Sequence, residues 1–309
     1  MTLGAIVALL AATVVAGTAI LFAAVGELLA ERSGIMNLGV EGMMLVGAVM
    51  GFIFTVLTGN HWYGLMAAMA GGGMMAAIHA FLTITLRANQ VVCGLALTIF
   101  GTGVSGFLGK SYQGTPITDP FRAVSIPVLA DIPVLGPIFF KQDVLVYISI
   151  IIAALLWLLL FRSRWGLSIR AVGQNPAAAD AVGISVSRVR YFCTIMGGVL
   201  AGMGGAYLSL AYAPSWQENM TSGRGWIAVA LVIFALWNPI RAILGSYLFG
   251  GVEALTFRMQ TAGVDISTFY LAMMPYLLTI FVLVLVTIRR RSEAGAPAAL
   301  TVPYHREER

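Results

Sequence analysis

Charge is scarce in this sequence: only 10% of its 309 residues are Asp, Glu, Lys or Arg, whereas 59% are hydrophobic. A water-soluble domain usually carries about 25% charged residues, so this composition excludes an ordinary soluble fold. Cysteine is almost absent, and Cys93 and Cys193 both fall in apolar stretches, which leaves no basis for a disulfide framework or a zinc site. The net charge of +5 comes from basic residues at the ends of apolar runs and in one loop, which indicates membrane topology rather than nucleic-acid binding.

The sequence also lacks the motifs of enzymes that act inside membranes, because it has no HExxH, no GxSxG and no paired carboxylates. His61, His79 and His305 are far apart and have no ligand-spaced companions, so no metal site is expected. The glycines of 101–106 satisfy GxGxxG but lie within an apolar run, and 109–111 ends like a phosphate-binding loop without the glycine required upstream. We therefore expect neither an enzyme nor a cofactor or ATP bound by this chain.

What the sequence does have is a series of apolar runs of roughly 17–25 residues, each long enough to cross about 30 Å of hydrocarbon as a helix. A membrane β-barrel would instead show segments of about 10 residues with alternating polarity, and none of sustained length is present. The predicted fold is all-α, a polytopic transmembrane helical bundle with about nine (roughly 8–10) spans. The expected spans are 3–26, 36–57, 62–86, 91–108, 144–161, 191–212, 225–238, 242–258 and 268–288. The 35 glycines further indicate close helix packing.

Basic residues in the short loops orient these spans, because Lys and Arg concentrate on the cytoplasmic side of a membrane. The loop 162–190 carries five arginines against one acid, and the tail opens with three arginines at 289–291, so both are expected to be cytoplasmic. Alternation of the spans then puts three further basic residues on the same side, Arg32, Arg87 and Arg241. The N-terminus is expected outside.

The predicted organisation is one transmembrane domain over 1–291, followed by a disordered cytoplasmic tail over 292–309 that has few bulky apolar residues. The segment 109–143 is the longest break between spans, and its five prolines predict an ordered external cap over an entrance. Residues 34–57 and 223–238 are both glycine-led apolar segments that run in opposite directions in this topology. That arrangement is typical of the inverted repeats of transporters, although the residue identity between the two segments is weak.

The most informative stretch is the polar loop 162–190, which contains helix-capping residues. Asn175 is a good N-cap residue, Pro176 suits the first helical position, and Gly183 can adopt the left-handed conformation that ends a helix. A helix of about two turns is marginal in water by itself, so it needs a docking partner. Two interpretations remain open: a coupling helix that seats in a cytoplasmic ATPase, or a capped connector whose arginines follow the inside rule.

Four strings of the sequence resemble one family of transport proteins. RAVGQNPAAADAVGI, at 170–184, is similar to the cytoplasmic signature of permeases in the branched-chain amino acid, ribose and nucleoside branch of ABC importers. ERSGIMNLGVEGMMLVGA at 31–48, ANQVVCGLALTIFGTGVSGFLGKSY at 88–112 and WIAVALVIFALWNPIRAILGSYLFGG at 226–251 resemble other motifs of that family. Thr98 stands where the family pattern has asparagine. The closest resemblance is to the nucleoside subgroup, which works with a basic-membrane-protein type lipoprotein.

The resemblance implies a permease subunit in the bacterial plasma membrane that is not itself an enzyme. It implies three partners: an ABC ATPase subunit that binds the ATP, a second homologous permease that completes a pseudo-symmetric heterodimer, and an extracytoplasmic substrate-binding lipoprotein. It also implies that the polar loop couples to the ATPase. The residues expected to matter for that coupling are Arg170, Gly173, Asn175, Pro176, Asp180 and Gly183.

Polar groups at membrane depth are costly and often face a cavity, so they are candidates for the translocation path. Glu41 follows Asn37 by four residues and shares its helix face, and Glu253 lies within the eighth expected span. The full set of candidates is Asn37, Glu41, Asn89, Gln90, Trp226 and Glu253. The alternatives are hydrogen bonding between helices for the polar groups and membrane anchoring for the aromatic ones.

The sequence therefore favours the membrane-spanning permease of an ATP-driven importer of a small polar solute, with nucleosides as the expected substrate. Ribose-type sugars and branched-chain amino acids are the alternatives within the same family. Outside it, an ion-coupled secondary transporter would work without an ATPase and would bind a proton at Glu41 or Glu253.

Overall fold

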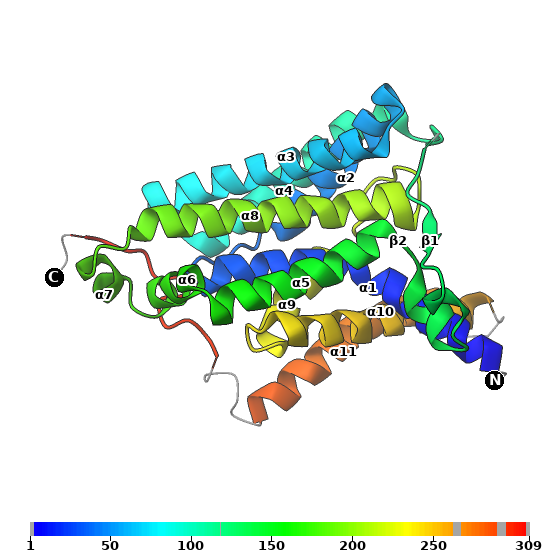
Figure 1. The fold of residues 1–309 in the computed structure, drawn as a ribbon. Coiled ribbons are helices and arrows are strands. Elements are labelled where there is room, and N and C mark those ends of the chain that lie inside the picture. The colour runs from blue at the N-terminus through cyan, green and yellow to red at the C-terminus, as the bar shows by residue number, and fades with distance from the viewer. Residues whose placement is uncertain (1–2, 118, 262–266, 289–294, 307–309) are drawn as a thin grey trace.

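The computed structural model describes residues 3–117, 119–261, 267–288 and 295–306, which form a helical bundle with one two-stranded sheet (Figure 1). The long helices are α1 (Leu3–Arg32), α2 (Val40–Thr58), α3 (His61–Ala80), α4 (Gln90–Gly109), α5 (Val144–Arg162), α8 (Val186–Tyr207), α10 (Pro239–Thr261) and α11 (Thr268–Ile288). The short helices are α6 (Arg164–Gln174), α7 (Pro176–Ala181) and α9 (Arg224–Phe234), and the strands are β1 (Ala123–Ser125) and β2 (Lys141–Asp143). The remaining turns are η1 (Phe81–Thr85), η2 (Lys110–Tyr112), η3 (Leu129–Asp131), η4 (Gly136–Phe140) and η5 (Leu208–Tyr212).

The all-α membrane bundle predicted from composition is confirmed. In the described residues, seven helices are long and apolar enough to cross a membrane, and each corresponds to an expected span. The expected crossing at 225–238 is wrong as a full span, because α9 has only 11 residues and is therefore about 16 Å long, half the thickness of the hydrocarbon layer. α11 has 21 residues, and its crossing stays a prediction.

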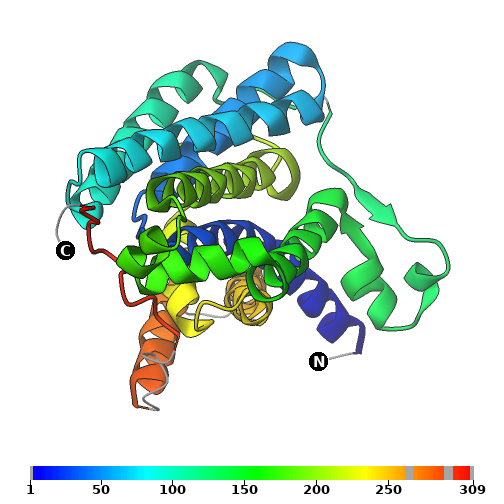
Figure 2. The same ribbon diagram turned by 60° about the vertical axis from the view of Figure 1, so that its left-hand side comes forward.

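Close helix packing, which the glycine content predicted, is confirmed around α8. This helix contacts α1, α2 and α3, and Figure 2 shows it between the layer of α2 to α4 and the layer that contains α1 and α10. A Cβ added at Gly47 would lie 2.5 Å from the Cα of Gly202, and one added at Gly72 would lie 2.2 Å from the carbonyl oxygen of Gly198. The backbones of α2, α3 and α8 therefore touch at positions that have no room for a side chain.

The 109–143 segment lies at the end of the bundle that also carries the N-terminus (Figure 1). Its two strands pair antiparallel, with Ala123 opposite Asp143, and the backbone N–H of Phe121 bonds to the carbonyl of Leu210 at 3.0 Å. Asp143 caps α5 by accepting hydrogen bonds from the N–H groups of the next turn, and burial nevertheless raises the pKa of its carboxyl group. The segment is thus fixed to the bundle at Phe121 and at Asp143, while its role as a cap over an entrance stays a prediction.

The opposite end of the bundle carries α6, α7 and the C-terminal segment (Figure 1). Of the tail 292–309, for which the sequence predicts disorder, the structure describes residues 295–306 in contact with the bundle, and the rest of that range lies outside the described residues. Disorder of the tail stays a prediction. The N–H of Ala299 bonds to the carbonyl of Gly173 at 2.9 Å, and Arg190 donates to the carbonyl of Val302 at 3.4 Å. The described part of the segment contacts the bundle through backbone hydrogen bonds and small buried residues.

Candidate functional site

Two non-helical segments, 33–39 and 213–223, precede α2 and α9, and the second of them meets the first turn of α2 at Glu41. The Glu41 side chain is buried, and its Oε1 accepts hydrogen bonds from the Thr221 hydroxyl at 2.5 Å and the Gly223 N–H at 2.8 Å. Its Oε2 accepts from the N–H of Gly225 at 2.6 Å. Glu41 therefore caps the start of α9, where unpaired N–H groups and the helix dipole favour a negative charge.

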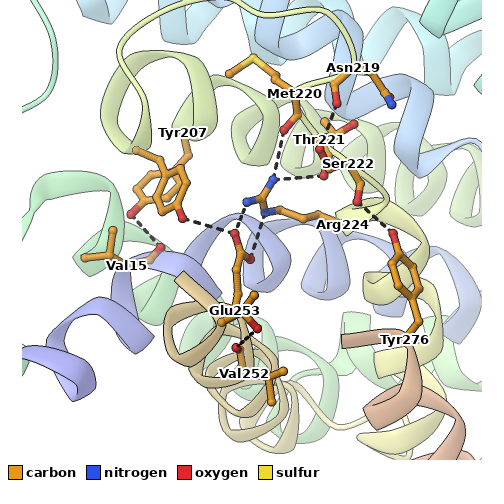
Figure 3. A network of polar contacts seen from close by, with 12 residues as sticks. Val15, Tyr207, Asn219, Met220, Thr221, Ser222, Arg224, Val252, Glu253 and Tyr276 are labelled. Carbon is orange, nitrogen blue, oxygen red and sulfur yellow. Dashed lines mark hydrogen bonds and ion pairs between the residues drawn. The ribbon is translucent and has the colours of Figure 1, made fainter. Parts of the chain in front are cut away.

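From the first residue of α9, Arg224 extends to Glu253 on α10 (Figure 3). The Arg224 Nε lies 3.3 Å from Oε2 of Glu253, and Nη2 contacts Oε1. The two side chains are only 11% and 15% exposed, and the Tyr212 hydroxyl donates a further hydrogen bond to Glu253 at 3.3 Å. The Nη1 of Arg224 donates to the carbonyls of Met220 and Thr221. This is a bidentate, mostly buried ion pair that ties α9 to α10.

A cavity of about 390 Å³ opens beside this ion pair, between α9, α10 and α11. Its wall combines Arg224 and Glu253 with an aromatic ring from each of two helices, Phe257 of α10 and Tyr276 of α11. The Tyr276 hydroxyl donates to the carbonyl of Ser222 at 3.0 Å, as Figure 3 shows. Thr256 and Gln260 add further polar groups to the wall. The volume and the mixture of aromatic, amide and charged groups suit a small polar ligand that contains a ring.

The remaining candidates for the translocation path lie elsewhere. Asn37 donates its backbone N–H to Glu27 at 2.7 Å and accepts from the N–H of Gly39, so it shapes the 33–39 segment. Gln90 accepts from the N–H of Met36 at 2.7 Å, and Asn89 caps α4. Trp226 is half-buried on α9. Of the six candidates, only Glu41 and Glu253 are joined by one network, through the first turn of α9, and the path itself stays a prediction.

Sequence reasoning missed Arg224, Tyr212 and Tyr276. Arg224 stands in the string GRG directly before an apolar run, so it reads as a residue at the edge of a span. One feature of the sequence could have indicated its position. The apolar run after Arg224 is short, because it ends at Asn238 and Pro239, and a short run is consistent with a helix that begins inside the membrane.

The helix predicted inside the polar loop is present as α7. The Asn175 side chain accepts a hydrogen bond from the N–H of Ala178 at 3.0 Å, and Pro176 occupies the first turn. Gly183 has a φ of 87°, and its N–H bonds to the carbonyl of Asp180 at 2.9 Å. The Asp180 carboxylate also contacts the C-terminal segment, through the Tyr304 hydroxyl at 3.0 Å.

The other two predicted coupling residues lie on α6 against the end of α1. A Cβ added at Gly173 would lie 2.2 Å from the carbonyl oxygen of Arg32, so α6 packs directly on the α1 backbone. The Arg170 guanidinium lies over the ring of Phe161, 5.4 Å from its centroid. The structure therefore brings all six predicted coupling residues to one end of the bundle, and their contact with an ATPase stays a prediction.

A helical membrane bundle with a cavity beside a mostly buried ion pair, and with a structured loop at one end, has the architecture of a membrane transport subunit. The chain belongs to the family described as branched-chain amino acid transport system / permease component, which matches residues 8–287. The resemblance inferred from the sequence strings is thereby confirmed. Proteins of this kind are transport components and not enzymes.

Three relatives are similar over nearly their whole length. The putative glucose ABC transporter permease protein TsgC13 of Haloferax volcanii is 44% identical over 97% of this chain and 98% of its own. The guanosine ABC transporter permease protein NupQ of Bacillus subtilis is 37% identical over 96% of each chain. The nucleoside ABC transporter permease protein NupC of Lactococcus lactis is 36% identical over 93% of each chain.

Proposed function

We propose that this ABC permease imports nucleosides and that the cavity beside Arg224 and Glu253 is where the solute is held during passage. The observation that carries the proposal is the composition of that wall, in which two aromatic rings and an ion pair face one space of about 390 Å³. Aromatic rings can stack on a nucleobase, while the amide, hydroxyl and charged groups can bond to base edges and ribose hydroxyls. The similarity to guanosine and nucleoside permease proteins supports the same solute class.

A chain of direct contacts connects the polar loop to this cavity. Gly173 of α6 packs on the carbonyl of Arg32, and the Arg32 side chain donates to the carbonyl of Trp237 at 2.8 Å. Trp237 follows α9, whose first residue is Arg224 in the cavity wall. Displacement of α6 and α7 by an ATPase would therefore move α9 and, with it, the ion pair. We propose that alternating access works through this connection.

The proposed complex contains an ABC ATPase subunit, a second homologous permease and an extracytoplasmic substrate-binding lipoprotein. The chain would be a multi-pass protein of the bacterial plasma membrane with α6, α7 and the C-terminal segment in the cytoplasm. Four arginines lie with these elements at one end of the bundle: Arg32, Arg87, Arg170 and Arg241. They support that orientation, because basic residues mark the cytoplasmic side of a membrane.

Uptake in cells or proteoliposomes that contain the chain with its partner subunits tests the proposed substrate and energy source. We expect uptake of labelled guanosine that stops when the ATPase partner is inactivated, with ribose and leucine as comparison solutes. Uptake of glucose alone would instead favour sugar import, the alternative supported by the similarity to TsgC13. Uptake by the chain alone in an ion gradient, without ATP, would overturn the ABC mechanism in favour of secondary transport.

Removing the caps of α7 is expected to weaken association with the ATPase. Asn175→Ala deletes an N-cap, which costs about 1 kcal/mol of helix stability, and Gly183→Val places a β-branched residue at a φ of 87°. The measurement is co-purification of the ATPase with each variant. Asn60→Ala is the matched control, because Asn60 caps α3 next to His61, which contacts Asp119 of the 109–143 segment at the opposite end of the bundle. Equal co-purification for all variants would contradict a docking role for α7.

A further inference from the structure

A second cavity, of about 550 Å³, lies at the end of the bundle that carries α6. Its lining comes from the ends of α1 and α5, from α6, from the start of α10 and the turn before it, and from the C-terminal segment. The lining residues are Arg32, Phe161, Arg170, Gln174, Leu236, Asn238, Arg241 and Gly295. Three of its lining residues are arginines, Arg32, Arg170 and Arg241. The cavity therefore sits where four helices and the C-terminal segment converge, apart from the cavity beside Glu253.

The described lining of this basic cavity contains no acidic residue. The nearest acid along the chain, Glu31, accepts a hydrogen bond from the Trp237 indole and is buried away from the space. Arg32 and Arg170 both lie over the ring of Phe161, with their guanidinium carbons 5.6 Å and 5.4 Å from its centroid. Two cations held against one ring repel each other, so an anion between them would lower the electrostatic energy.

Hydrogen-bonding capacity is also left over in the basic cavity. All three guanidinium nitrogens of Arg32 already donate, Nε and Nη2 to the carbonyl of Trp237 and Nη1 to the carbonyl of Gly295 at 3.3 Å. By contrast, the buried Nε of Arg170 has no hydrogen-bond partner in the described structure. Arg241 is exposed at the rim. Gln174 and Asn238 also line this space, but the Gln174 amide already bonds to Ala296 and Ala298 of the C-terminal segment. The lining thus presents planar guanidinium groups together with the amide of Asn238, and both kinds of group can donate to a phosphate.

We propose that this basic cavity binds a phosphate-bearing anion. The anion would bridge Arg170 of α6 to Arg32 of α1 and Arg241 of α10, and would thereby strengthen the attachment of α6 to the bundle. Its source could be the headgroup of an anionic phospholipid or a soluble phosphate compound, because the cavity lies at the end assigned to the cytoplasmic membrane surface. The proposal does not depend on which solute the permease carries.

Thermal unfolding of the purified full-length chain in a neutral detergent tests the proposal. A thiol-reactive dye reports unfolding, because Cys193 is buried and Cys93 is half-buried in the folded chain. The probes are pyrophosphate, phosphatidylglycerol in mixed micelles, and phosphatidylcholine and sodium chloride as controls. We expect pyrophosphate or phosphatidylglycerol to raise the unfolding temperature, and whichever acts identifies a soluble or a lipid source.

Variants decide whether the effect arises in the basic cavity. Arg170→Gln and the exposed Arg241→Gln are each expected to weaken the apparent affinity for the active probe roughly tenfold. Arg188→Gln is the control, because Arg188 lies on the same polar loop but lines a different surface. The proposal is overturned if neither probe acts, if chloride at equal ionic strength has the same effect, or if both cavity variants respond like the control.

Discussion

Replacing Gly205 of α8 with alanine is expected to destabilise the folded chain by about 3 kcal/mol or more, because the new Cβ would lie 1.9 Å from the carbonyl oxygen of Met44. The clash is with backbone on α2, which cannot move aside as a flexible side chain could. The change is measured as the unfolding temperature and the monodisperse yield in detergent.

Gly103→Ala is the matched control for this substitution. Gly103 is also helical, on α4, but an added Cβ there meets nothing within 4 Å. Alanine is a better helix former than glycine by about 1 kcal/mol, so this variant should be neutral or slightly more stable. If both variants unfold at the same temperature, the close approach of α8 to α2 is refuted.

Glu253→Gln is expected to destabilise the protein by about 3–5 kcal/mol and to abolish uptake, because it leaves the Arg224 guanidinium 11% exposed and without its counter-charge. Unfolding temperature and uptake of labelled solute are measured on the same preparations. Glu218→Gln, which changes an exposed carboxylate in the 213–223 segment, should leave both properties unchanged.

A compensating double substitution separates a structural role of the ion pair from contact with the solute. Combining Glu253→Gln with Arg224→Met removes both charges, and stability should recover most of the loss, since a buried pair can be replaced by uncharged groups of similar size. Uptake should remain absent if the pair touches the solute. Recovery of both stability and uptake would show that the pair only ties α9 to α10.

The sequence predicted best what depends on short stretches of chain. The length of the apolar runs was enough to place seven helices, and the capping residues Asn175 and Gly183 marked the limits of α7. The first result follows from the thickness of the hydrocarbon layer, which sets the length of a span. The second follows from the hydrogen bonds that a capping residue makes within one helix turn. No long-range contact was needed to find them.

The errors arose where distant residues decide the outcome. α9 ends early because the chain turns at Leu236 and Trp237, whose φ angles are 51° and 53°, and this turn is held by Arg32 and Glu31 from the far end of α1. The C-terminal segment likewise packs through a distant contact, because its backbone bonds to Gly173, more than a hundred residues away in the sequence. Neither contact leaves a pattern in the local sequence.

The Arg224–Glu253 pair shows the same limitation for the site. Glu253 was recognisable as a carboxylate within an apolar span. Its partner Arg224 begins α9, a short helix that was predicted from the sequence to cross the whole membrane. Sequence reasoning therefore found one half of the ion pair and two of the residues in its network. The cavity itself required the relative placement of α9, α10 and α11.

The continuity of α8 has a mechanical consequence. Together with η5 it forms 27 uninterrupted helical residues, from Val186 within the polar loop to Tyr212, whose hydroxyl contacts Glu253. At 1.5 Å per residue this rod is about 40 Å long, so tilting one end by about 5° would sweep the other through roughly 3.5 Å. A small rotation of α8 at the polar loop would thus displace Tyr212 by more than the length of a hydrogen bond, which is enough to break its contact with Glu253.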